Sequence, residues 1–574
     1  MSRHLHPVEM LFKWARECPD KPWLHQPTNG SMVSYTWAQA AEMVGRMAAA
    51  MKAQGWEPGS CIAICGINTA HWFMADLAAQ LAGYVPVGLY PKQAPKMTRY
   101  IMRHCEAKAL FVGPMPEADD FMLGIPAGIP RIRFPYQGTP AGGVSWDEFC
   151  AGFEPIREYT RPSPDTVMML VYTSGTTGNP KGVMMTYGNL EFVGSELLDK
   201  VFKAGPDERF FSYLPLAHLL ERAGGLGGSL YSCAEVFFLE ELDREKVLEV
   251  LRSAAPTRFV AIPLIWTRFH TSLAAKVPEH WLRRLVRLPL LGPWLRRRLL
   301  SLIGLQNVRT AFSGGAPLPR ATYEFFRDIF DIEIFEAYGQ TENSAYCSMR
   351  LAGEFRPGSV GKPLENAGFR LSPEGEIQVK HPGVMAGYYR DPEQTHKAFT
   401  EDGWLKTGDK GYLDADGHLY ISGRIKEIFK TLKGKYVAPA PIELAMARNT
   451  DIDQSCLVGV GLTQPILLVS LTADARKKSR DAVAQKLIGD MAAVNSSCED
   501  HEQIAQILVV AEEWTIENGF MTPTMKVKRD VIERHYASAI EREAAKRKQS
   551  LAWLDPMPAA AAPAELEPEH ALQN

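Results

Sequence analysis

The sequence has little cysteine and no marked excess of either charge. Nine cysteines occur in 574 residues, and none forms a Cys-x-x-Cys pair. This excludes a disulfide scaffold and favours reduced, buried thiols of a cytosolic protein over a metal or redox site. The 63 Lys and Arg residues nearly balance 66 Asp and Glu residues, for a formal net charge of -3. A dedicated nucleic-acid binder would carry a basic excess, so no nucleic acid is expected as a partner.

Long apolar runs are also absent. No uninterrupted run reaches the ~18–20 residues that a membrane-spanning helix needs. The N-terminal residues MSRHLH are not followed by the apolar stretch of a signal peptide. We therefore expect a cytoplasmic protein.

Residues 281–305 are the exception to this even composition. They read WLRRLVRLPLLGPWLRRRLLSLIGL, with six arginines and no acidic residue. Pro289, Gly292 and Pro293 are expected to divide the segment into two short helices. Two interpretations stay open: peripheral contact with the inner face of an anionic membrane, or a pair of surface helices whose apolar sides pack on the core.

Strand and helix patterns alternate in the first part of the chain. An α/β fold class with a parallel, helix-covered sheet is therefore expected. Short runs separated by Gly, Pro and Asp between about 374 and 423 indicate a small antiparallel β unit. We expect a large N-terminal domain at 1–423, a smaller mobile α+β domain at 424–548, and a disordered Ala/Pro-rich tail at 549–574. The expected helices lie at 35–53 and 71–82, and the expected strands at 61–66, 84–87, 167–172, 456–462 and 466–471.

A glycine- and hydroxyl-rich loop follows the strand expected at 167–172. Residues 172–183 read YTSGTTGNPKGV. Glycines let backbone N–H groups approach phosphate oxygens, and hydroxyls and a lysine add donors and positive charge. The loop is not a Walker A motif, because Pro180 precedes the lysine. It is expected to bind a polyphosphate through Thr173, Ser174, Gly175, Thr176, Thr177, Gly178 and Lys181.

The same string resembles the signature of the adenylate-forming (AMP-binding) superfamily, which includes acyl-CoA synthetases. Six further family-like motifs follow in order: 214–218 (LPLAH), 313–317 (SGGAP), 338–342 (YGQTE), 407–409 (TGD), 423–426 (GRIK) and 523–526 (PTMK). The resemblance implies a large N-terminal domain and a small mobile C-terminal one. It also implies that a carboxylate and ATP form acyl-AMP and pyrophosphate, after which a thiol, commonly that of coenzyme A, displaces AMP.

The resemblance also implies the nucleotide-binding residues. Glu342, together with Thr176, would hold Mg²⁺, since a hard cation prefers oxygen ligands. Thr341 would bind the α-phosphate, and Asp409, assisted by Arg424, would bind the ribose hydroxyls. The adenine would lie against Gly314, Gly315, Ala316, Tyr338 and Gly339.

Three further positions carry implied roles in catalysis. His218 would line the acyl pocket next to the reacting carboxylate, although a histidine after an apolar run is also an ordinary core residue. Lys526 would bridge the carboxylate and the α-phosphate, with Lys528 as the alternative, and Lys426 would be the hinge. Met525 departs from the family pattern, because glycine is usual there; Arg529 keeps the family spacing. The basic segment 430–439 would bind coenzyme A phosphates or be a solvated loop.

The strings at 214–222, 311–319 and 423–443 most resemble long-chain fatty acyl-CoA synthetases. A fatty acid–CoA ligase using ATP and Mg²⁺ is therefore the leading hypothesis. Adenylation with transfer to a carrier protein or another acceptor is the alternative, and a non-catalytic nucleotide- or acyl-binding protein is a third. A zinc protease is not expected, because His501-Glu502 lacks the second histidine of that motif.

Overall fold

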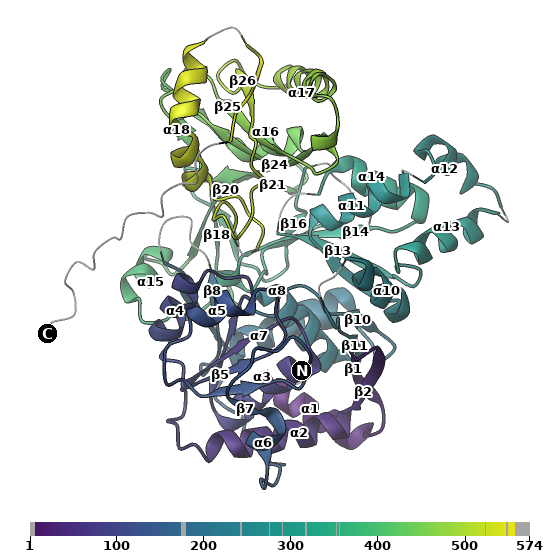
Figure 1. The fold of residues 1–574 in the computed structure, drawn as a ribbon, viewed down its shortest axis with the longest axis vertical. Helices are drawn as coiled ribbons and strands as arrows, with labels where there is room; N and C mark the ends of the chain where they lie inside the picture. The colour runs from purple at the N-terminus through teal and green to yellow at the C-terminus, as the bar shows by residue number, and fades with distance from the viewer. Residues whose placement is uncertain are drawn as a thin grey trace, which may run out of the picture. The chain divides into compact units, whose positions relative to one another are not determined.

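The protein is described here by a computed structural model. It describes residues 6–173, 179–241, 244–274, 276–289, 291–315, 318–351, 353–354, 356, 358–522, 524–546 and 549–556 (Figure 1). The chain divides into two compact units. Unit 1 comprises Met1–Thr407 and Gly411–Ile421, and unit 2 comprises Gly408–Lys410 and Ser422–Asn574.

An eight-stranded sheet lies in unit 1. Its order is β19-β9-β8-β4-β3-β5-β6-β7, and the strands from β8 to β7 pair in parallel. β9 runs antiparallel to β8, and β19 antiparallel to β9. The strands are β3 (Cys61–Cys65), β4 (Val85–Leu89), β5 (Ala109–Val112), β6 (Arg131–Arg133), β7 (Val144–Ser145), β8 (Val167–Thr173), β9 (Lys181–Thr186) and β19 (Gly387–Tyr388).

Helices α2 (Trp37–Lys52) and α3 (Ala70–Ala82) belong to the core cluster of this part of unit 1. The Thr36 and Thr69 side chains accept hydrogen bonds from backbone amides in the first turns of α2 and α3. Gly83 ends α3 in the left-handed region. The helices expected at 35–53 and 71–82, and the strands expected at 61–66, 84–87 and 167–172, are all present within one or two residues at most ends.

A second, nine-stranded sheet completes the large core of unit 1. Its order is β16-β15-β14-β13-β12-β10-β11-β1-β2, with a parallel centre and antiparallel edges. The strands are β1 (Pro22–Thr28), β2 (Ser31–Thr36), β10 (Arg209–Phe211), β11 (Glu235–Phe237), β12 (Arg258–Ala261), β13 (Thr310–Gly314), β14 (Ile334–Tyr338), β15 (Ser348–Met349) and β16 (Lys362–Pro363).

A four-stranded sheet has the order β17-β18-β20-β21. Its strands are β17 (Phe369–Leu371), β18 (Glu376–Val379), β20 (Leu405–Leu413) and β21 (Leu419–Arg424). This is the small β unit expected between about 374 and 423. Both β20 and β21 contribute residues to each of the two units.

The remaining helices of unit 1 connect these strands. The α-helices are α1 (Pro7–Glu17), α4 (Pro95–His104), α5 (Ala118–Leu123), α6 (Trp146–Cys150), α7 (Tyr187–Val193), α8 (Leu219–Glu221), α9 (Gly228–Ser232), α10 (Arg244–Ala254), α11 (Pro263–Ala274), α12 (Glu279–Leu285), α13 (Leu291–Leu302), α14 (Arg320–Phe330) and α15 (Pro392–Ala398). Two π-helical segments occupy Gly194–Phe202 and Arg222–Gly227, and a 3₁₀ turn occupies Thr341–Asn343.

The segment 281–305 forms two helices as expected, but the break is placed differently. The first helix ends at Leu285, and α13 already begins at Leu291, so Gly292 and Pro293 lie inside its first turn. A proline in a first helical turn costs little, because its missing N–H would have no partner within the helix. None of the helices in the described ranges is long and apolar enough to cross a membrane.

Unit 2 is built on a four-stranded sheet in the order β24-β25-β26-β27. Alternate residues of β25 enter two core clusters, Leu467 and Val469 on one face and Ile466 and Leu468 on the other. The elements are β22 (Phe429–Lys430), β23 (Tyr436–Val437), α16 (Pro439–Met446), β24 (Ile452–Val458), β25 (Ile466–Leu471), α17 (Arg480–Asn495), β26 (Gln506–Val509), α18 (Arg529–Ala545) and β27 (Leu551–Trp553), with a 3₁₀ turn at Ala475–Lys477.

The prediction of a disordered tail from residue 549 is wrong for its first residues. Leu551–Trp553 form β27, which pairs in parallel with β26. Leu551 and Ala552 are buried in the two opposite core clusters, so this short strand belongs to the folded unit. Residues 557–574 lie outside the described ranges.

Candidate functional site

Strands β8 and β9 hold the two ends of the glycine-rich loop. The antiparallel register places Thr173, the last residue of β8, opposite Lys181, the first residue of β9. The five residues Ser174, Gly175, Thr176, Thr177 and Gly178, all predicted to bind phosphate, lie outside the described residues. Lys181 is therefore positioned by strand pairing at the base of the loop.

Tyr388 links Lys181 to Glu342. The Lys181 ammonium lies 4.6 Å from the centre of the Tyr388 ring, a distance at which a cation is attracted to an aromatic face. The Tyr388 hydroxyl donates a hydrogen bond to Glu342 Oε1 at 3.0 Å. Burial and the neighbouring Glu342 carboxylate raise the pKa of Tyr388, so its hydroxyl stays a donor. We call these three residues the Lys181–Tyr388–Glu342 cluster.

Elements distant in the sequence support both ends of this cluster. Lys181 Nζ also donates to Gln394 Oε1 at 2.8 Å, and Gln394 lies in the first turn of α15, where its amide binds the Asp391 side chain. Tyr388 is placed by β19, which pairs with β9 opposite Val183. The sequence did not point to Tyr388 or Gln394, because neither residue lies in one of the motifs that resemble the family.

Glu342 lies in a 3₁₀ turn directly after β14. Gly339 is required there, because a Cβ atom would lie 2.4 Å from the carbonyl carbon of Ala345. The Gln340 amide donates to Asn343 Oδ1 at 2.8 Å, and its side chain donates to the Thr407 carbonyl at 2.7 Å. These contacts fix the backbone that presents Thr341 and Glu342.

The predicted adenine-binding residues meet at the ends of two parallel strands. Gly314 at the end of β13 pairs with Ala337, next to Tyr338 at the end of β14. Gly315 has a φ of +85°, and no atom lies within 4 Å of where its Cβ would be, so the backbone here is open. Ligands of α/β proteins bind at such carboxyl ends of strands. Ala316 lies outside the described residues.

His218 is half-buried and caps the N-terminus of the short helix α8. Its Nδ1 accepts a hydrogen bond from the Leu220 amide at 3.2 Å. Three residues later, the buried Glu221 accepts a hydrogen bond from Ser212 Oγ at 2.6 Å, and Asn68 donates to the same Oγ at 2.9 Å. Burial raises the pKa of Glu221 to about 8, despite the Ser212 hydrogen bond. Glu221 was not singled out from the sequence.

In unit 2, Asp409 and Arg424 are neighbours. Asp409 is buried on β20, and Arg424 Nε lies 3.2 Å from its Oδ1. Gly408 has a φ of +69°, and its carbonyl accepts the Ile425 amide at 2.9 Å. The structure therefore brings together the two residues predicted at the ribose. Lys426 is exposed in the turn that follows β21.

Lys526 is exposed at the end of a tight turn. The Thr522 amide donates to the Lys526 carbonyl at 2.8 Å, and the Lys526 amide donates to Thr522 Oγ1 at 3.0 Å. Met525 has a φ of +61°, which is the left-handed region that glycine adopts freely. The backbone thus has the conformation that explains the family's usual glycine, although methionine stands there. Lys528 is half-buried, and burial lowers its pKa.

Arg529 connects this turn to the rest of unit 2. It is the first residue of α18, and its guanidinium donates to both carboxylate oxygens of Glu443 on α16, at 2.8 and 3.0 Å. It also donates to the Leu457 carbonyl at 2.5 Å. Although burial opposes its charge, Glu443 holds the pKa of Arg529 above its usual value. Glu443 lies inside a string compared with the family, but its role required the fold.

The basic segment 430–439 forms the β22–β23 hairpin. The Thr431 amide donates to the Lys435 carbonyl at 2.9 Å, and Lys430 Nζ lies 5.5 Å from the centre of the Tyr436 ring. Lys430, Lys433 and Lys435 are exposed. Their predicted contact with coenzyme A stays a prediction.

Comparison with known protein families identifies the family of this chain. A family model described as "AMP-binding enzyme" matches residues 11–389, and one described as "AMP-binding enzyme C-terminal domain" matches residues 427–547. The chain therefore belongs to the family of AMP-binding enzymes.

Among curated proteins, the chain is similar to long-chain-fatty-acid–CoA ligase FadD15 of Mycobacterium tuberculosis, at 29% identity over 94% of this chain and 97% of that one. It is also similar to long chain acyl-CoA synthetase 7, peroxisomal, of Arabidopsis thaliana, at 28% identity over 90% and 82%. Long-chain-fatty-acid–CoA ligase 5 of Mus musculus is 31% identical over 84% and 79%.

Solved structures share the fold. The anthranilate CoA ligase AuaEII in complex with anthranoyl-AMP matches with a TM-score of 0.76 at 21% identity, over 95% of this chain and 99% of that one. The adenylation domain of a carboxylate reductase from Mycobacterium chelonae matches with a TM-score of 0.77 at 20% identity, over 94% and 91%. The predicted α/β fold class is confirmed.

Proposed function

We propose that this AMP-binding enzyme is an acid–thiol ligase that activates a fatty acid with ATP and transfers the acyl group to coenzyme A. The observation that carries the proposal is the Lys181–Tyr388–Glu342 cluster beside the glycine-rich loop. Tyr388 contacts the Lys181 ammonium with its ring and the Glu342 carboxylate with its hydroxyl. The adjoining loop residues are predicted to donate hydrogen bonds to phosphate. The fatty acid and coenzyme A are inferred from the printed names of the relatives.

The reaction requires two displacements. In the first, a carboxylate oxygen of the acid attacks the α-phosphorus of ATP, and pyrophosphate leaves with the electrons of the broken P–O bond. In the second, the sulfur of coenzyme A attacks the acyl carbon, the thiol proton is lost, and AMP leaves. Because the first step brings two anions together, the protein must neutralise phosphate charge and align the reactants.

The proposed roles divide among the described residues. Lys181 balances phosphate charge, and Thr341 donates to the α-phosphate. His218, held by the Leu220 amide, orients the acid. Lys526 stabilises the charge that develops between carboxylate and phosphate. The nucleoside is bound by Gly314, Gly315, Tyr338, Gly339, Asp409 and Arg424.

Glu342 suits a magnesium ion. Its carboxylate offers two oxygens, of which Oε1 accepts the Tyr388 hydrogen bond, and hard cations prefer carboxylate ligands. With Thr176, Glu342 would hold Mg²⁺, which when bound supplies charge neutralisation for the phosphates. Tyr388 orients that carboxylate from outside the ligand set, as residues behind a metal ligand commonly do.

An ATP–pyrophosphate exchange assay tests the proposal. We expect exchange that depends on a fatty acid and on Mg²⁺, across acids of two to twenty carbons, followed by thioester formation with coenzyme A. Absence of exchange with every acid would reject the proposal. The alternative, transfer to a carrier protein or another acceptor, is favoured if acyl-AMP accumulates in the presence of saturating coenzyme A.

We propose Lys426 as the hinge between the two half-reactions. It lies in an exposed turn where the Glu427 and Ile428 amides bind the Arg424 carbonyl at 2.9 and 3.0 Å. Proline at this position restricts its own φ and the residue before it. We expect Lys426→Pro to keep pyrophosphate exchange and lose thioester formation, with Lys426→Ala as the control that keeps both. Retention of both activities in the proline variant would remove the hinge assignment.

A cytoplasmic location is proposed with this function, and contact with a membrane surface through 281–305 is proposed as well.

A further inference from the structure

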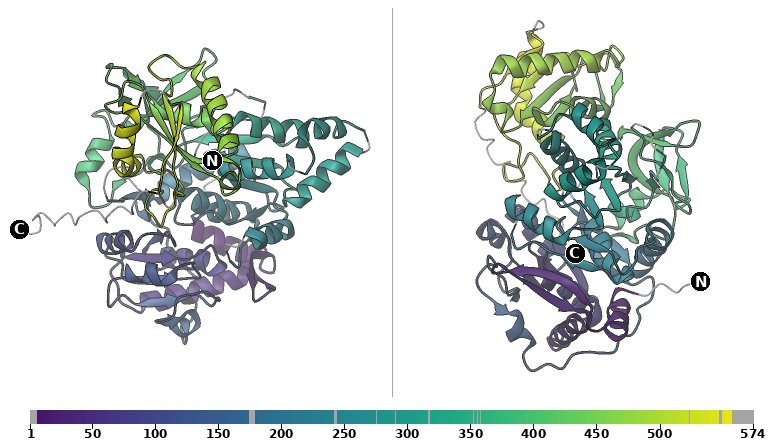
Figure 2. Two further views of the ribbon diagram at one scale, coloured as in Figure 1. Left: turned by 45° about the horizontal axis from the view of Figure 1, so that its top comes forward. Right: turned by 90° about the vertical axis from the view of Figure 1, so that its right-hand side faces the viewer.

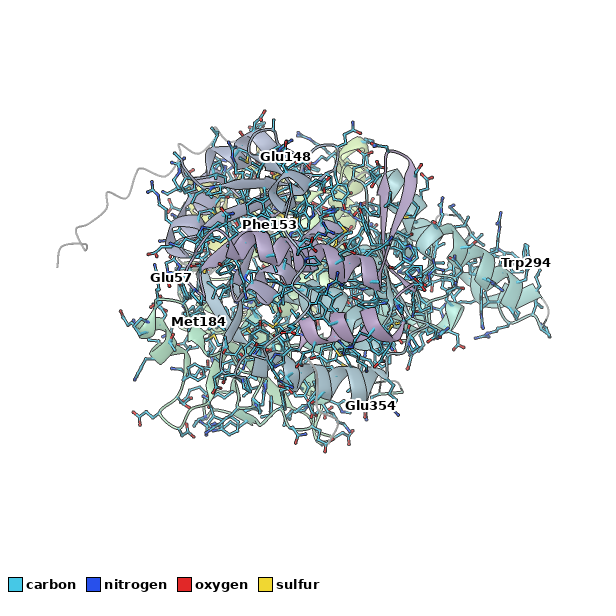
Figure 3. All side chains as sticks on the ribbon, turned by 90° about the horizontal axis from the view of Figure 1, so that it is seen from below. Glu57, Glu148, Phe153, Met184, Trp294 and Glu354 are labelled. Carbon is cyan, nitrogen blue, oxygen red and sulfur yellow. The ribbon has the colours of Figure 1, made fainter. Side chains whose placement is uncertain are left out.

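Helices α12 and α13 and the turn between them expose four large apolar side chains. Trp281 is 50% exposed, Leu288 45%, Leu291 45% and Trp294 63%. Trp281 lies on α12, and Leu288 lies in the turn that follows that helix. Leu291 and Trp294 of α13 are three residues apart, a spacing at which helical residues share a face. Figures 1 and 2 show α12 and α13 extending away from the nine-stranded sheet of unit 1, and Figure 3 shows Trp294 near the outer end of this pair.

Other apolar side chains of α12, α13 and the turn between them pack in the core of unit 1. Leu282, Val286, Leu299 and Leu300 are buried in the core cluster that includes α14. Arg283, whose side chain is 34% exposed, forms ion pairs with Glu279 at 2.7 Å and Asp328 at 2.6 Å. Packing in the core therefore explains why these buried residues are apolar, but it does not explain the exposed Trp281, Leu288, Leu291 and Trp294.

Arginines surround the exposed apolar residues. Arg287, Arg297 and Arg298 are exposed, and within the described ranges none of the three forms an ion pair with an acidic side chain. No acidic residue occurs from 281 to 305. A solvated helix pair would ordinarily intersperse both signs of charge, whereas this surface combines unpaired cations with two tryptophans. We call Trp281, Arg287, Leu288, Leu291, Trp294, Arg297 and Arg298 the α12–α13 surface.

We propose that the α12–α13 surface docks on an anionic phospholipid bilayer. Tryptophan prefers the headgroup region, leucine side chains enter the adjoining acyl layer, and arginine binds lipid phosphate while its stem stays apolar. Charge complementarity selects an anionic lipid surface as the occupant. Nucleic acid would use the arginines but not the leucines. The proposal goes beyond the ligase reaction and does not depend on which acid is activated.

Vesicle sedimentation with the full chain tests the proposal. We expect binding to vesicles of phosphatidylcholine with about one-third phosphatidylglycerol, and at least tenfold weaker binding to phosphatidylcholine alone. Salt at about 1 M should weaken binding further, because it shortens the range of electrostatic attraction to about 3 Å. Binding of equal strength to both vesicle types would overturn the proposal.

Two variants separate the charged and apolar contributions. R287Q/R297Q/R298Q should bind anionic vesicles about 100-fold more weakly, since each basic residue near such a surface contributes about fivefold. W281A/W294A should lose at least tenfold. The matched charge control, R16Q/K52Q/R103Q, removes three exposed positive charges elsewhere on unit 1 and should bind like the parent chain; Leu123→Ala, 64% exposed, is the apolar control.

The outcome is independent of the ligase proposal. Pyrophosphate exchange with a water-soluble short-chain acid should be unchanged in both α12–α13 variants, which also shows that they are folded. Normal vesicle binding by these variants, or an equal loss in the controls, would overturn the docking assignment. Preferential binding of an acidic protein or nucleic acid over anionic vesicles would also overturn it. Failure of exchange in the parent chain would count against the ligase proposal alone.

Discussion

The charges proposed to act on ATP are held in two different ways. In unit 1, Lys181 and Glu342 are joined through Tyr388, with a ring contact on one side and a hydrogen bond on the other. In unit 2, Lys526 is exposed in a tight turn, where its backbone amide donates to Thr522 Oγ1, and Arg529, three residues on, binds Glu443. The first arrangement fixes the charged groups themselves. The second presents its lysine from an exposed turn whose backbone is fixed by hydrogen bonds to Thr522.

Removal of Lys526 is expected to have the largest effect among the variants that test this comparison of the two units. We expect Lys526→Ala to reduce acyl-AMP formation by about 10²–10³-fold, as loss of a donor to a developing negative charge does. Conversion of supplied acyl-AMP to acyl-CoA should continue. Both half-reactions are measured separately, with Lys528→Ala as the matched control that keeps adenylation. If Lys528→Ala fails instead, the wrong lysine has been assigned.

Glu221, the buried carboxyl three residues after His218, tests how burial in unit 1 changes stability with pH. The pKa of Glu221 is about 8 in the fold against 4.5 in the unfolded chain. Between these values the folded state keeps a proton that the unfolded chain releases, so the free energy of unfolding falls as pH rises from about 4.5 to 8. We expect Glu221→Gln to remove this dependence and to raise the free energy of unfolding by about 4 kcal/mol at pH 8.

Chemical denaturation of the parent and variant at pH 5 and pH 8 measures this effect. At pH 5 the two chains should differ little, because both carry a neutral side chain at residue 221 in the fold. Glu57→Gln, on the exposed surface (Figure 3), is the control that should change neither value. A parent chain more stable at pH 8 than at pH 5, with no difference from the Gln variant, would contradict a buried protonated Glu221.

Tyr388→Phe keeps the aromatic ring near Lys181 and removes only the hydroxyl that binds Glu342. We expect adenylation to fall about tenfold at limiting Mg²⁺ and to recover partly at high Mg²⁺, because a residue that orients a metal ligand affects metal affinity. Rates at several Mg²⁺ concentrations measure this. Tyr389→Phe, which leaves the cluster intact, is the control. An unchanged Mg²⁺ dependence in Tyr388→Phe would separate Tyr388 from the metal site.

Substitution of Met525 is expected to have the smallest effect, a change in the stability of unit 2. Its left-handed backbone is unfavourable for a side chain, so Met525→Gly should raise the stability of unit 2 by up to about 1 kcal/mol, with Met525→Ala as the control that keeps the Cβ. Denaturation monitored in unit 2 compares the two variants. Equal stability of the glycine and alanine variants would mean that this backbone conformation carries no net cost.

Local sequence signals were sufficient where function depends on neighbours in the chain. The strand before the glycine-rich loop follows from a local apolar run, and the Asp409–Arg424 pair was expected from the resemblance of two short motifs to the family. Tyr388 and Glu443 could not be found in that way, because each acts through contacts with elements many residues distant. The short strand β27 was missed for a similar reason: three residues next to an Ala/Pro-rich tail form a strand only because β26 provides an edge for pairing.

Strands β20 and β21 have a consequence for the way such chains recombine. Asp409 belongs to unit 2 although it precedes the last part of unit 1 in the sequence, and the chain passes between the units at 407/408, 410/411 and 421/422. A crossover between related genes near residue 422 would therefore combine Asp409 from one parent with Arg424 from the other. It would also combine Gly408 from the first parent with the residue at position 425 from the second. Functional hybrids should be those in which both parents conserve these two pairs, so the length of an exchangeable C-terminal module is set by strand pairing rather than by the linear domain boundary.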